Sequence, residues 1–517
     1  MEQIALLDIP EQPEREPICT VVMEAVPAEP RFVALDRNQV RWTNLDLDTL
    51  IAIDHPARAI WALVSDLDLQ EFEQGCLNRG ERAGRPSWSP QVLVSIWVYA
   101  YSQGISSARA IERIMTWEPG LRWLAADESI NHHTLSDFRM GRKEQLDALF
   151  VKVLGVMESA ELVDLQTLLQ DGTKVRAQAS KESFHRRKTL EEHCARARWA
   201  LTELEERGEQ EGDERRCRAA RERAAGEKSA RLKAALEELS RREAETAGKE
   251  RAKLRVSETE AEARKMKHAD GAWAPSYNVQ VTTEAKSRVI AAVAVSEAVN
   301  DAQELLPAVE RISQVTGQTP ARMIADGGYV SRENVEGLSE ENVELIAPWK
   351  DSDSRSAGAC TRQGIGEEYR PSAFAHDAGN DTLVCPQGRR LTLVKIGQHH
   401  GVHCQAYEAS AVECQACEAK PHCCPRSSAR RVERVVESEA MQRFQRRMET
   451  TEARQLYRRR SEVAEFPHMW WKGTWKWRRF SVRGMAKAAK EALWLAIAYN
   501  VQQWIRLCWK PRFEVAA

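Results

Sequence analysis

Two aspartates, Asp171 and Asp326, each follow a predicted apolar strand and each precede a glycine. A carboxylate at such a strand end projects over the crevice in which open α/β sheets bind their ligands. Paired carboxylates suit Mg²⁺, a hard ion that prefers oxygen ligands. Two such ions, about 4 Å apart, can activate a water or a 3′-hydroxyl and stabilise the leaving oxygen of a phosphodiester. The alternative for each aspartate is a simple Asp-Gly turn.

The C-terminal region offers two candidates for a third carboxylate, Glu462 and Glu465. Glu465 and Lys472 are seven residues apart, so on a helix they share nearly the same face. A glutamate and a lysine on one face can hold a metal and a phosphate together. Pro467 disfavours helical backbone at Phe466, and we therefore expect Glu465 at a kink or at a helix start.

Aromatic and basic residues alternate over residues 470–479 (Trp-Trp-Lys-Gly-Thr-Trp-Lys-Trp-Arg-Arg). Aromatic rings can stack on unpaired bases while cations contact phosphates, although core packing is the alternative for the rings. Trp470 and Trp477 share a helix face and fit the core better. The cations predicted to contact DNA are Lys476, Arg478, Arg479 and Arg483.

The chain of 517 residues is nearly neutral, but its charge is unevenly distributed. Residues 426–517 hold 21 Lys and Arg against 9 Asp and Glu. A basic end favours a polyanionic partner, and a solvated helix face is the alternative. The hydrophobic content of 43% excludes wholesale disorder. No apolar run reaches the roughly 18–20 residues of a membrane span, and the N-terminus lacks a signal-peptide layout, so we expect a soluble, cytosolic protein without a membrane partner.

Seven of the 12 cysteines lie between residues 360 and 424. Without a secretory signal, this clustering favours a metal over disulfides. Cys414 and Cys417 form a Cys-x2-Cys pair which, with Cys385 and Cys423, is a candidate tetrahedral Zn²⁺ set. The segment has little apolar core of its own, so a structural metal would stabilise it. Reduced thiols without a metal are the alternative. Other candidate ligands are Cys404, His403, His422 and Cys424.

The elements that must position these residues alternate between strands and helices. The pattern predicts a mixed α/β sheet, with an apolar strand over residues 162–169 that stops at a turn before Asp171. Residues 135–149 are predicted as one helix, and residues 485–504 as a last amphipathic helix. Ser89 and Pro90 predict the start of a helix, because serine is favoured at the N-cap and proline at the first helical position.

Changes in composition predict five parts. Residues 183–255, rich in Ala, Glu, Arg and Lys, are expected to form two antiparallel helices that serve in dimerisation or DNA contact, or form only a solvated insertion. The predicted parts are a flexible arm (1–45), a helical DNA-binding domain (46–160), the first part of the core with the helical insertion (161–349), the Cys-rich insertion (350–430) and the basic C-terminal catalytic region (431–517).

Several segments together resemble the DDE transposases of bacterial insertion sequences, in the subgroup with a helical N-terminal domain and a ribonuclease-H-like core. The resemblance covers about residues 85–505, and it rests on the order and spacing of the motifs because no single motif is specific. The segments are 134–139 (Thr-Leu-Ser-Asp-Phe-Arg), 171–174 (Asp-Gly-Thr-Lys), 266–280, the helix cap Asn300-Asp301, 325–329 (Ala-Asp-Gly-Gly-Tyr), 464–467 (Ala-Glu-Phe-Pro) and 478–484 (Arg-Arg-Phe-Ser-Val-Arg-Gly).

The resemblance implies roles for individual residues. Asp171, Asp326 and Glu465 would bind Mg²⁺ or Mn²⁺, and Lys472 would contact phosphate near the cleaved bond. Tyr457 and Arg460 resemble the Tyr and Arg that precede the glutamate, although the gap from Arg460 to Glu465 is one residue longer than usual. That longer gap keeps Glu462 as a rival.

The resemblance implies cleavage of the ends of an insertion sequence and joining of the 3′-hydroxyl to target DNA. The partners would be double-stranded terminal inverted repeats and target DNA, and the enzyme, associated with the bacterial nucleoid, would act as a homodimer or larger assembly because two ends must be paired. The alternatives are a catalytically silent DNA-binding protein descended from a transposase, a nuclease without strand transfer, and an interaction scaffold. No Walker A sequence supports ATP-driven action.

Overall fold

The computed structural model describes residues 45–73, 87–141, 143–207, 215–349, 352–399 and 402–514. The chain divides into two units, Met1–Asp46 and Leu47–Ala517, and every element named below belongs to the second unit. The predicted flexible arm lies outside the described residues, except for Leu45. In the part of the chain that is described, no helix has both the length and the apolar character needed to cross a membrane.

The N-terminal part of the second unit is helical, as predicted. Helix α3 starts at Pro90, and Ser89 occupies the N-cap in an extended conformation. The single helix predicted over 135–149 is wrong: the chain forms two helices, and Gly141, a poor helix former, lies in the break between them. The main helices here are α1 (Pro56–Ser65), α3 (Pro90–Ser102), α4 (Ala108–Ile114), α5 (Pro119–Leu124), α6 (His132–Arg139) and α7 (Lys143–Ser159).

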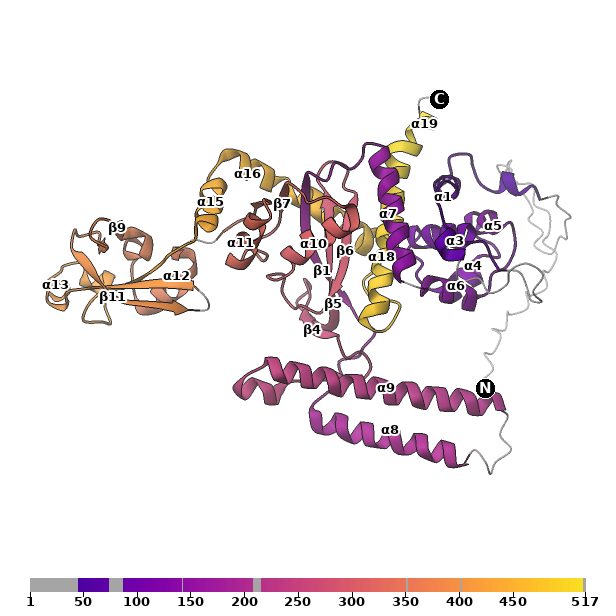
Figure 1. Cartoon of the computed structure of the whole chain (residues 1–517), viewed down its shortest axis with the longest axis horizontal. Helices are drawn as coiled ribbons and strands as arrows, with labels where there is room; N and C mark the ends of the chain where they lie inside the picture. The colour runs from indigo at the N-terminus through magenta and orange to yellow at the C-terminus, as the bar shows by residue number, and fades with distance from the viewer. Residues whose placement is uncertain are drawn as a thin grey trace, which may run out of the picture. The chain divides into compact units, whose positions relative to one another are not determined.

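A six-stranded mixed sheet follows, so the predicted α/β class is confirmed (Figure 1). Its central strand β1 pairs antiparallel with β5 on one side and parallel with β7 on the other. Beyond these, β5 pairs antiparallel with β4 and β6, and β7 pairs parallel with β8. The strands are β1 (Thr167–Arg176), β4 (Arg264–Lys267), β5 (Trp273–Glu284), β6 (Ile290–Ser296), β7 (Arg322–Ile324) and β8 (Glu344–Ile346).

The predicted end of the first strand before Asp171 is wrong, because β1 runs on to Arg176. Strand β5 supplies a partner for every residue of β1 from Leu168 onward, and Asp171 lies opposite Val281. The aspartate is therefore in the middle of a long central strand and not in a turn. Asp326 lies where it was predicted, two residues beyond the end of β7.

Helices flank this sheet, and one of them joins it to the N-terminal helices. Helix α18 (Met485–Trp504) contacts α3, α7 and β6. It was predicted to be amphipathic, but it is buried on nearly all sides because these elements cover it. Asn500 accepts from the backbone N–H of Ile290 at 2.8 Å and donates to its carbonyl at 2.9 Å, which fixes the helix to β6. Two further helices are α10 (Leu305–Thr316) and α11 (Arg332–Glu340).

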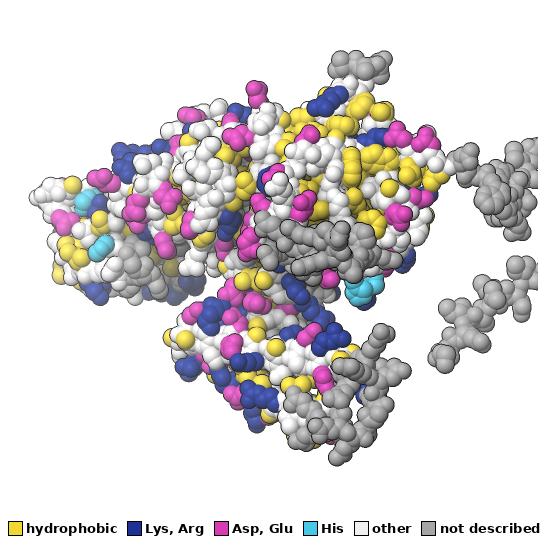
Figure 2. Space-filling view, turned by 45° about the vertical axis from the view of Figure 1, so that its right-hand side comes forward, with side chains coloured by type: hydrophobic (Ala, Val, Ile, Leu, Met, Phe, Trp, Pro, Cys, Tyr) yellow, Lys and Arg dark blue, Asp and Glu magenta, His cyan; other side chains and the backbone are white. Residues whose placement is uncertain are grey.

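The segment 183–255 contains the two predicted long helices, α8 (Arg187–Arg207) and α9 (Arg215–Glu245). They are antiparallel, because Arg187 at the start of α8 pairs with Glu243 at the end of α9. Their shared seam is apolar, with Leu190 and Leu239 buried in it. Acidic and basic side chains are interspersed on their outer surfaces (Figure 2).

The Cys-rich segment forms its own antiparallel five-stranded sheet, in the order β13-β12-β11-β10-β9. The expectation that it has little core is wrong: Phe374, Leu383, Leu391 and Tyr407 are buried together. Its elements are α12 (Ser352–Gln363), β9 (Ala375–Asp377), β10 (Thr382–Val384), β11 (Arg390–His399), β12 (Val402–Ala409), α13 (Ala411–Gln415), α14 (Lys420–Cys423) and β13 (Arg431–Val435). Three helices precede α18: α15 (Glu439–Met448), α16 (Thr451–Arg458) and α17 (Arg460–Met469).

Candidate active site

The structure brings Asp171 and Asp326 together around one cation, Arg460. The Arg460 Nη2 atom donates to Asp171 Oδ1 at 2.8 Å and lies 3.8 Å from Asp326 Oδ2. Asp171 and Arg460 are largely buried, with side chains 13% and 12% exposed, whereas Asp326 is 41% exposed. Arg460 was predicted to contact DNA, but here its guanidinium offsets the repulsion between two carboxylates.

Asp326 is held by its own loop. Its Oδ1 atom accepts from the backbone N–H of Gly328 at 2.7 Å, which is the geometry of an Asx turn. Its Oδ2 atom is the one that faces Arg460. One carboxylate oxygen is therefore used by the loop, while the other points to the site.

Helix α17 carries Arg460 along the sheet. Val463 and Ala464 are buried against the apolar residues Leu169, Ile324 and Ile346 of β1, β7 and β8. The expectation of a kink or a helix start at Glu465 is wrong, because Pro467 is inside α17 and Glu465 lies in mid-helix. A π-helical turn, Trp470–Thr474, follows directly.

Two other side chains of this helical segment reach β1. His468 Nε2 lies 3.5 Å from Asp171 Oδ2, and its side chain is 10% exposed. Neither ring nitrogen of His468 has a hydrogen-bond partner, and the Nε of Arg460 also lacks one. Lys472 donates to the hydroxyl of Thr173, and to the carbonyl of Lys174 at 3.2 Å. Burial lowers the pKa of Lys472, while the nearby Asp171 charge acts in the opposite direction.

Glu465 is exposed, and it is not part of the contacts that join the two aspartates. Its position on α17 nevertheless separates it from Glu462. At about 100° per residue, Glu465 is about 60° around the helix from His468, whereas Glu462 is about 120° away. Glu465 is therefore closer than its rival to the face that meets Asp171.

At Asp301 the sequence predicts only a helix cap and not a site residue. Its Oδ1 accepts from Asn278 Nδ2 and from Gln280 Nε2, both at 2.7 Å. The Tyr329 hydroxyl donates to Gln280 Oε1 at 2.6 Å. Burial first, and then the charges of Asp301, Asp171 and Asp326, raise the pKa of Tyr329.

A buried polar network supports this acidic cluster. Gln280 also accepts from Gln170 at 2.7 Å, and Gln170 accepts from the Thr282 hydroxyl at 2.6 Å. Strand β5 is buried from Ala274 to its end, yet every second residue is polar. This alternation was the available signal in the sequence, because buried polar side chains need partners and commonly support a site.

The remaining predicted DNA contacts fall into two groups. Lys476, Arg478, Arg479 and Arg483 are exposed. Tyr457 is instead half-buried against the apolar cluster beneath α17. The core interpretation of the tryptophans is confirmed, since Trp477 is buried and Trp470 packs against the main core. A backbone hydrogen bond holds the segment that carries these cations against β1: the Arg176 N–H donates to the carbonyl of Arg478 at 3.2 Å.

The four predicted zinc cysteines line one small cavity of about 20 Å³. Cys424 lines it as well, whereas Cys404, His403 and His422 do not. Among the described residues, no three of the sulfurs approach within 4.8 Å of one another. Burial, together with the neighbouring thiols, raises the pKa of Cys423 to about 12, and Arg430 opposes this shift.

Two family models match the chain. A transposase DDE domain matches residues 384–505, and a transposase domain (DUF772) matches residues 45–141. The first match includes Arg460, Glu465 and Lys472, while the second covers helices α1 to α6. No curated protein and no solved structure matches the chain. Both matched families are transposase families, which act on DNA, and together the two matches support a DDE transposase of an insertion sequence.

Proposed function

We propose that this transposase cleaves the ends of its insertion sequence and joins the freed 3′-hydroxyl to target DNA. The observation that carries the proposal is the convergence of Asp171 and Asp326 on one cation, 2.8 and 3.8 Å from their oxygens. A position that accommodates one cation between two carboxylates suits a divalent metal.

We infer a ribonuclease-H-like catalytic core. Its support is the central position of β1, which carries Asp171 between an antiparallel strand and a parallel one. The parallel neighbour, β7, leads directly to Asp326. The two carboxylates therefore come from adjacent strands of one sheet.

The residues present fit a divalent metal. Asp171, Asp326 and Glu465 would hold Mg²⁺ or Mn²⁺, and oxygen-only ligands match the preference of these ions. In support of a further ligand beside Asp171, the two ring nitrogens of His468 and the Nε of Arg460 are buried without a hydrogen-bond partner. When bound, such ions supply an activated water or hydroxyl and stabilise a leaving oxygen.

The protein's own groups have separate roles in this proposal. Arg460 keeps the two carboxylates together and can turn to a phosphate, since a guanidinium binds both groups in the same geometry. Lys472 presents its ammonium beside Thr173, two residues after Asp171, where it would contact the phosphate next to the cleaved bond. Asp301 and Tyr329 hold Gln280 and the buried polar network around it in place beside the site.

DNA binding is assigned to three surfaces. The exposed cations Lys476, Arg478, Arg479 and Arg483 adjoin the end of β1, and we propose that they contact the backbone of the element end. We also keep the helical part 46–160 as a DNA-binding domain and 183–255 as an insertion for dimer or DNA contact. A homodimer or larger assembly follows from the need to pair two element ends.

The five cysteines around one cavity support a structural Zn²⁺ site in the Cys-rich part 350–430. Zinc would require the sulfurs to move closer together and to lose their protons. Cys414→Ser should then lower zinc content by one ion per chain, with the loss measured after dialysis. An unchanged content would favour the reduced thiols.

The test is an assay with labelled DNA that carries the inverted repeats of the element, Mg²⁺ and a target plasmid. Cleaved ends together with joined products support a transposase. Cleaved ends without joined products would replace it with a nuclease. Specific binding without cleavage would identify a silent DNA-binding protein.

A further inference from the structure

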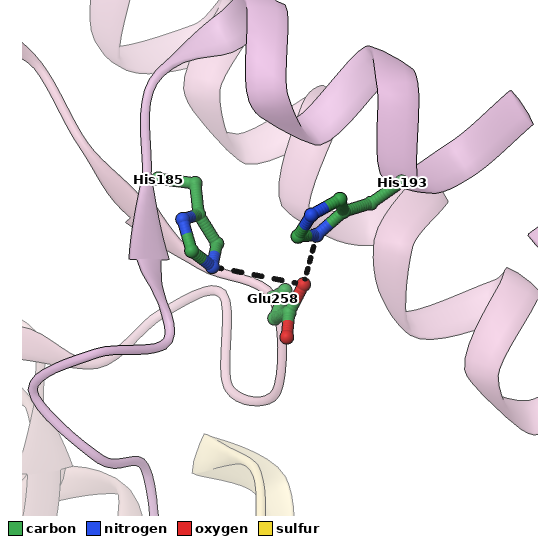
Figure 3. Close-up of side chains that lie close together, drawn as sticks. All are labelled: His185, His193 and Glu258. Carbon is green, nitrogen blue, oxygen red and sulfur yellow. Dashed lines mark hydrogen bonds and ion pairs between the residues drawn. The ribbon is translucent and has the colours of Figure 1, made fainter. Parts of the chain in front are cut away.

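Three potential metal ligands meet at the root of the helical insertion, away from the acidic cluster: His185, His193 and Glu258 (Figure 3). The Nδ1 atom of His193 lies 2.6 Å from Glu258 Oε2, and the Nε2 atom of His185 lies 3.8 Å from the same oxygen. The imidazole rings are 5.0 Å apart and nearly perpendicular. One ligand atom from each residue lies within 4.8 Å of the other two.

The three residues belong to three different segments of chain. His185 is in the short strand β2 (Phe184–His185), which leads into the insertion, and His193 is in the second turn of α8. Glu258 directly follows β3 (Val256–Ser257), where the chain returns. Strands β2 and β3 pair antiparallel, and the N–H of Glu258 donates to the carbonyl of Ser183 at 2.9 Å. The backbone therefore holds the ligands in register before any ion binds.

A hydrogen-bonded His–Glu pair explains only part of this arrangement. His193 alone gives Glu258 a good partner, while His185 stands too far away for a hydrogen bond to the same oxygen. Both imidazoles nevertheless turn a nitrogen toward that carboxylate (Figure 3). A cation placed among the three groups would use all of them.

The ligand types identify the class of ion. Two imidazoles and one carboxylate suit Zn²⁺ and neighbouring first-row ions, whereas Mg²⁺ prefers oxygen ligands alone. The side chains are 24–28% exposed, so an ion can reach them. His193 and Glu258 also line a hollow of about 350 Å³ together with Arg196 and Lys228. These two cations weaken metal binding by repulsion, but they favour an anion or a hydroxide as the fourth ligand.

We propose that His185, His193 and Glu258 bind one divalent transition-metal ion of the Zn²⁺ class, which clamps together both chain connections of the helical insertion. The site is separate from the acidic cluster at Asp171 and from the cysteine cavity. The clamp does not depend on the catalytic proposal.

The test uses the full-length protein, stripped with a chelator and then loaded with Zn²⁺ or Co²⁺ alone. Co²⁺ distinguishes the sites, because thiolate ligands add strong near-ultraviolet charge-transfer bands that imidazole and carboxylate ligands lack. The variants are His193→Ala and the conservative Glu258→Gln. The matched control is His132→Ala, because His132 also contacts a glutamate, Glu112, at 2.7 Å, with similar exposure.

We expect both site variants to bind one ion per chain fewer than wild type and His132→Ala, and the Co²⁺ absorption that they lose to contain no thiolate bands. Zn²⁺ should also raise the Tm of wild type and of the control more than that of either variant. The proposal is overturned if Glu258→Gln retains the metal content of wild type, or if the Co²⁺ absorption lost in the variant contains thiolate bands. If circular dichroism shows that His193→Ala is unfolded, the metal content of Glu258→Gln alone tests the proposal.

Discussion

Arg460 and Asp171 are 289 residues apart in sequence, yet the guanidinium donates to the carboxylate at 2.8 Å. The contact joins α17 to the central strand β1. The same nitrogen lies 3.8 Å from Asp326, so one arginine compensates two acidic groups. In the proposed reaction, a divalent metal would compete with Arg460 for these oxygens.

This competition predicts how Arg460→Ala should behave. Removing the guanidinium leaves two nearby carboxylates without their cation, and we expect a loss of about 1–3 kcal/mol in the free energy of unfolding. Added Mg²⁺ should raise the Tm of this variant more than that of wild type, because ligand binding stabilises the folded state. Thermal unfolding with and without Mg²⁺ measures both effects. Equal Mg²⁺ responses in the two proteins would argue against a metal site at these oxygens.

The choice between Glu465 and Glu462 gives a paired prediction. Glu465→Gln should reduce end cleavage by more than about 100-fold. Loss of a residue that only supports a metal ligand already lowers metal affinity or activity by about 10–100-fold, and loss of a ligand itself should cost more. Glu462→Gln changes another exposed glutamate of the same helix, and its cleavage rate should stay within about threefold of wild type. Cleavage rates at saturating Mg²⁺ decide between them, and the reverse result would make Glu462 the third carboxylate.

Lys472 predicts a dependence on pH. Burial lowers its pKa below the ordinary value of 10.5, so the folded protein loses this charge at a lower pH than the unfolded chain does. As the pH rises from the folded-state pKa of Lys472 toward its unfolded-state pKa, the contribution of Lys472 to stability therefore increases. Over the same pH range its ability to contact phosphate falls. Lys472→Arg remains charged, so the ratio of variant to wild-type cleavage should increase as the pH is raised toward 10.5. A ratio independent of pH would remove Lys472 from phosphate binding.

Gly172 is predicted to be a packing requirement of the site. A methyl group there would lie 2.6 Å from Asp301 Oδ1, 2.7 Å from Gln280 Nε2 and 3.0 Å from the Tyr329 hydroxyl. Gly172→Ala should therefore cost about 1–3 kcal/mol in unfolding free energy and reduce cleavage.

The control is Gly226→Ala in α9, where nothing lies within 4 Å of the added methyl group. That change should stabilise the protein by up to about 1 kcal/mol, because alanine is the better helix former. Denaturant unfolding of both variants provides the comparison. A stable and active Gly172→Ala protein would show that Asp301, Gln280 and Tyr329 can move without loss of stability or activity.

The sequence was informative where a local preference agreed with the tertiary structure. Ser89-Pro90 begins a helix as expected, and the two long helices of the insertion follow from their composition. Local preference alone favours a turn at Asp171-Gly172, but pairing with β5 outweighs that preference. Pro467 similarly remains inside a helix that is packed against the sheet.

The site was only partly predictable for the same reason. Strand ends predict the two aspartates, but Asp301 is held by side-chain hydrogen bonds from Asn278 and Gln280, which are more than 20 residues away in the sequence. His185 and Glu258 are 73 positions apart, separated by the whole helical insertion, so no spacing rule would pair them. Contacts of this kind arise from topology and not from any local pattern.

The most direct test of the central claim compares wild type with Asp326→Asn on DNA carrying the element ends. Asparagine keeps the size of the side chain and removes the charge that faces Arg460. With Mg²⁺, wild type should cleave the ends and yield joined products, and both should fall by more than about 100-fold in the variant while DNA binding is retained. Undiminished cleavage by Asp326→Asn would contradict the assignment of Asp171 and Asp326 as the catalytic carboxylates.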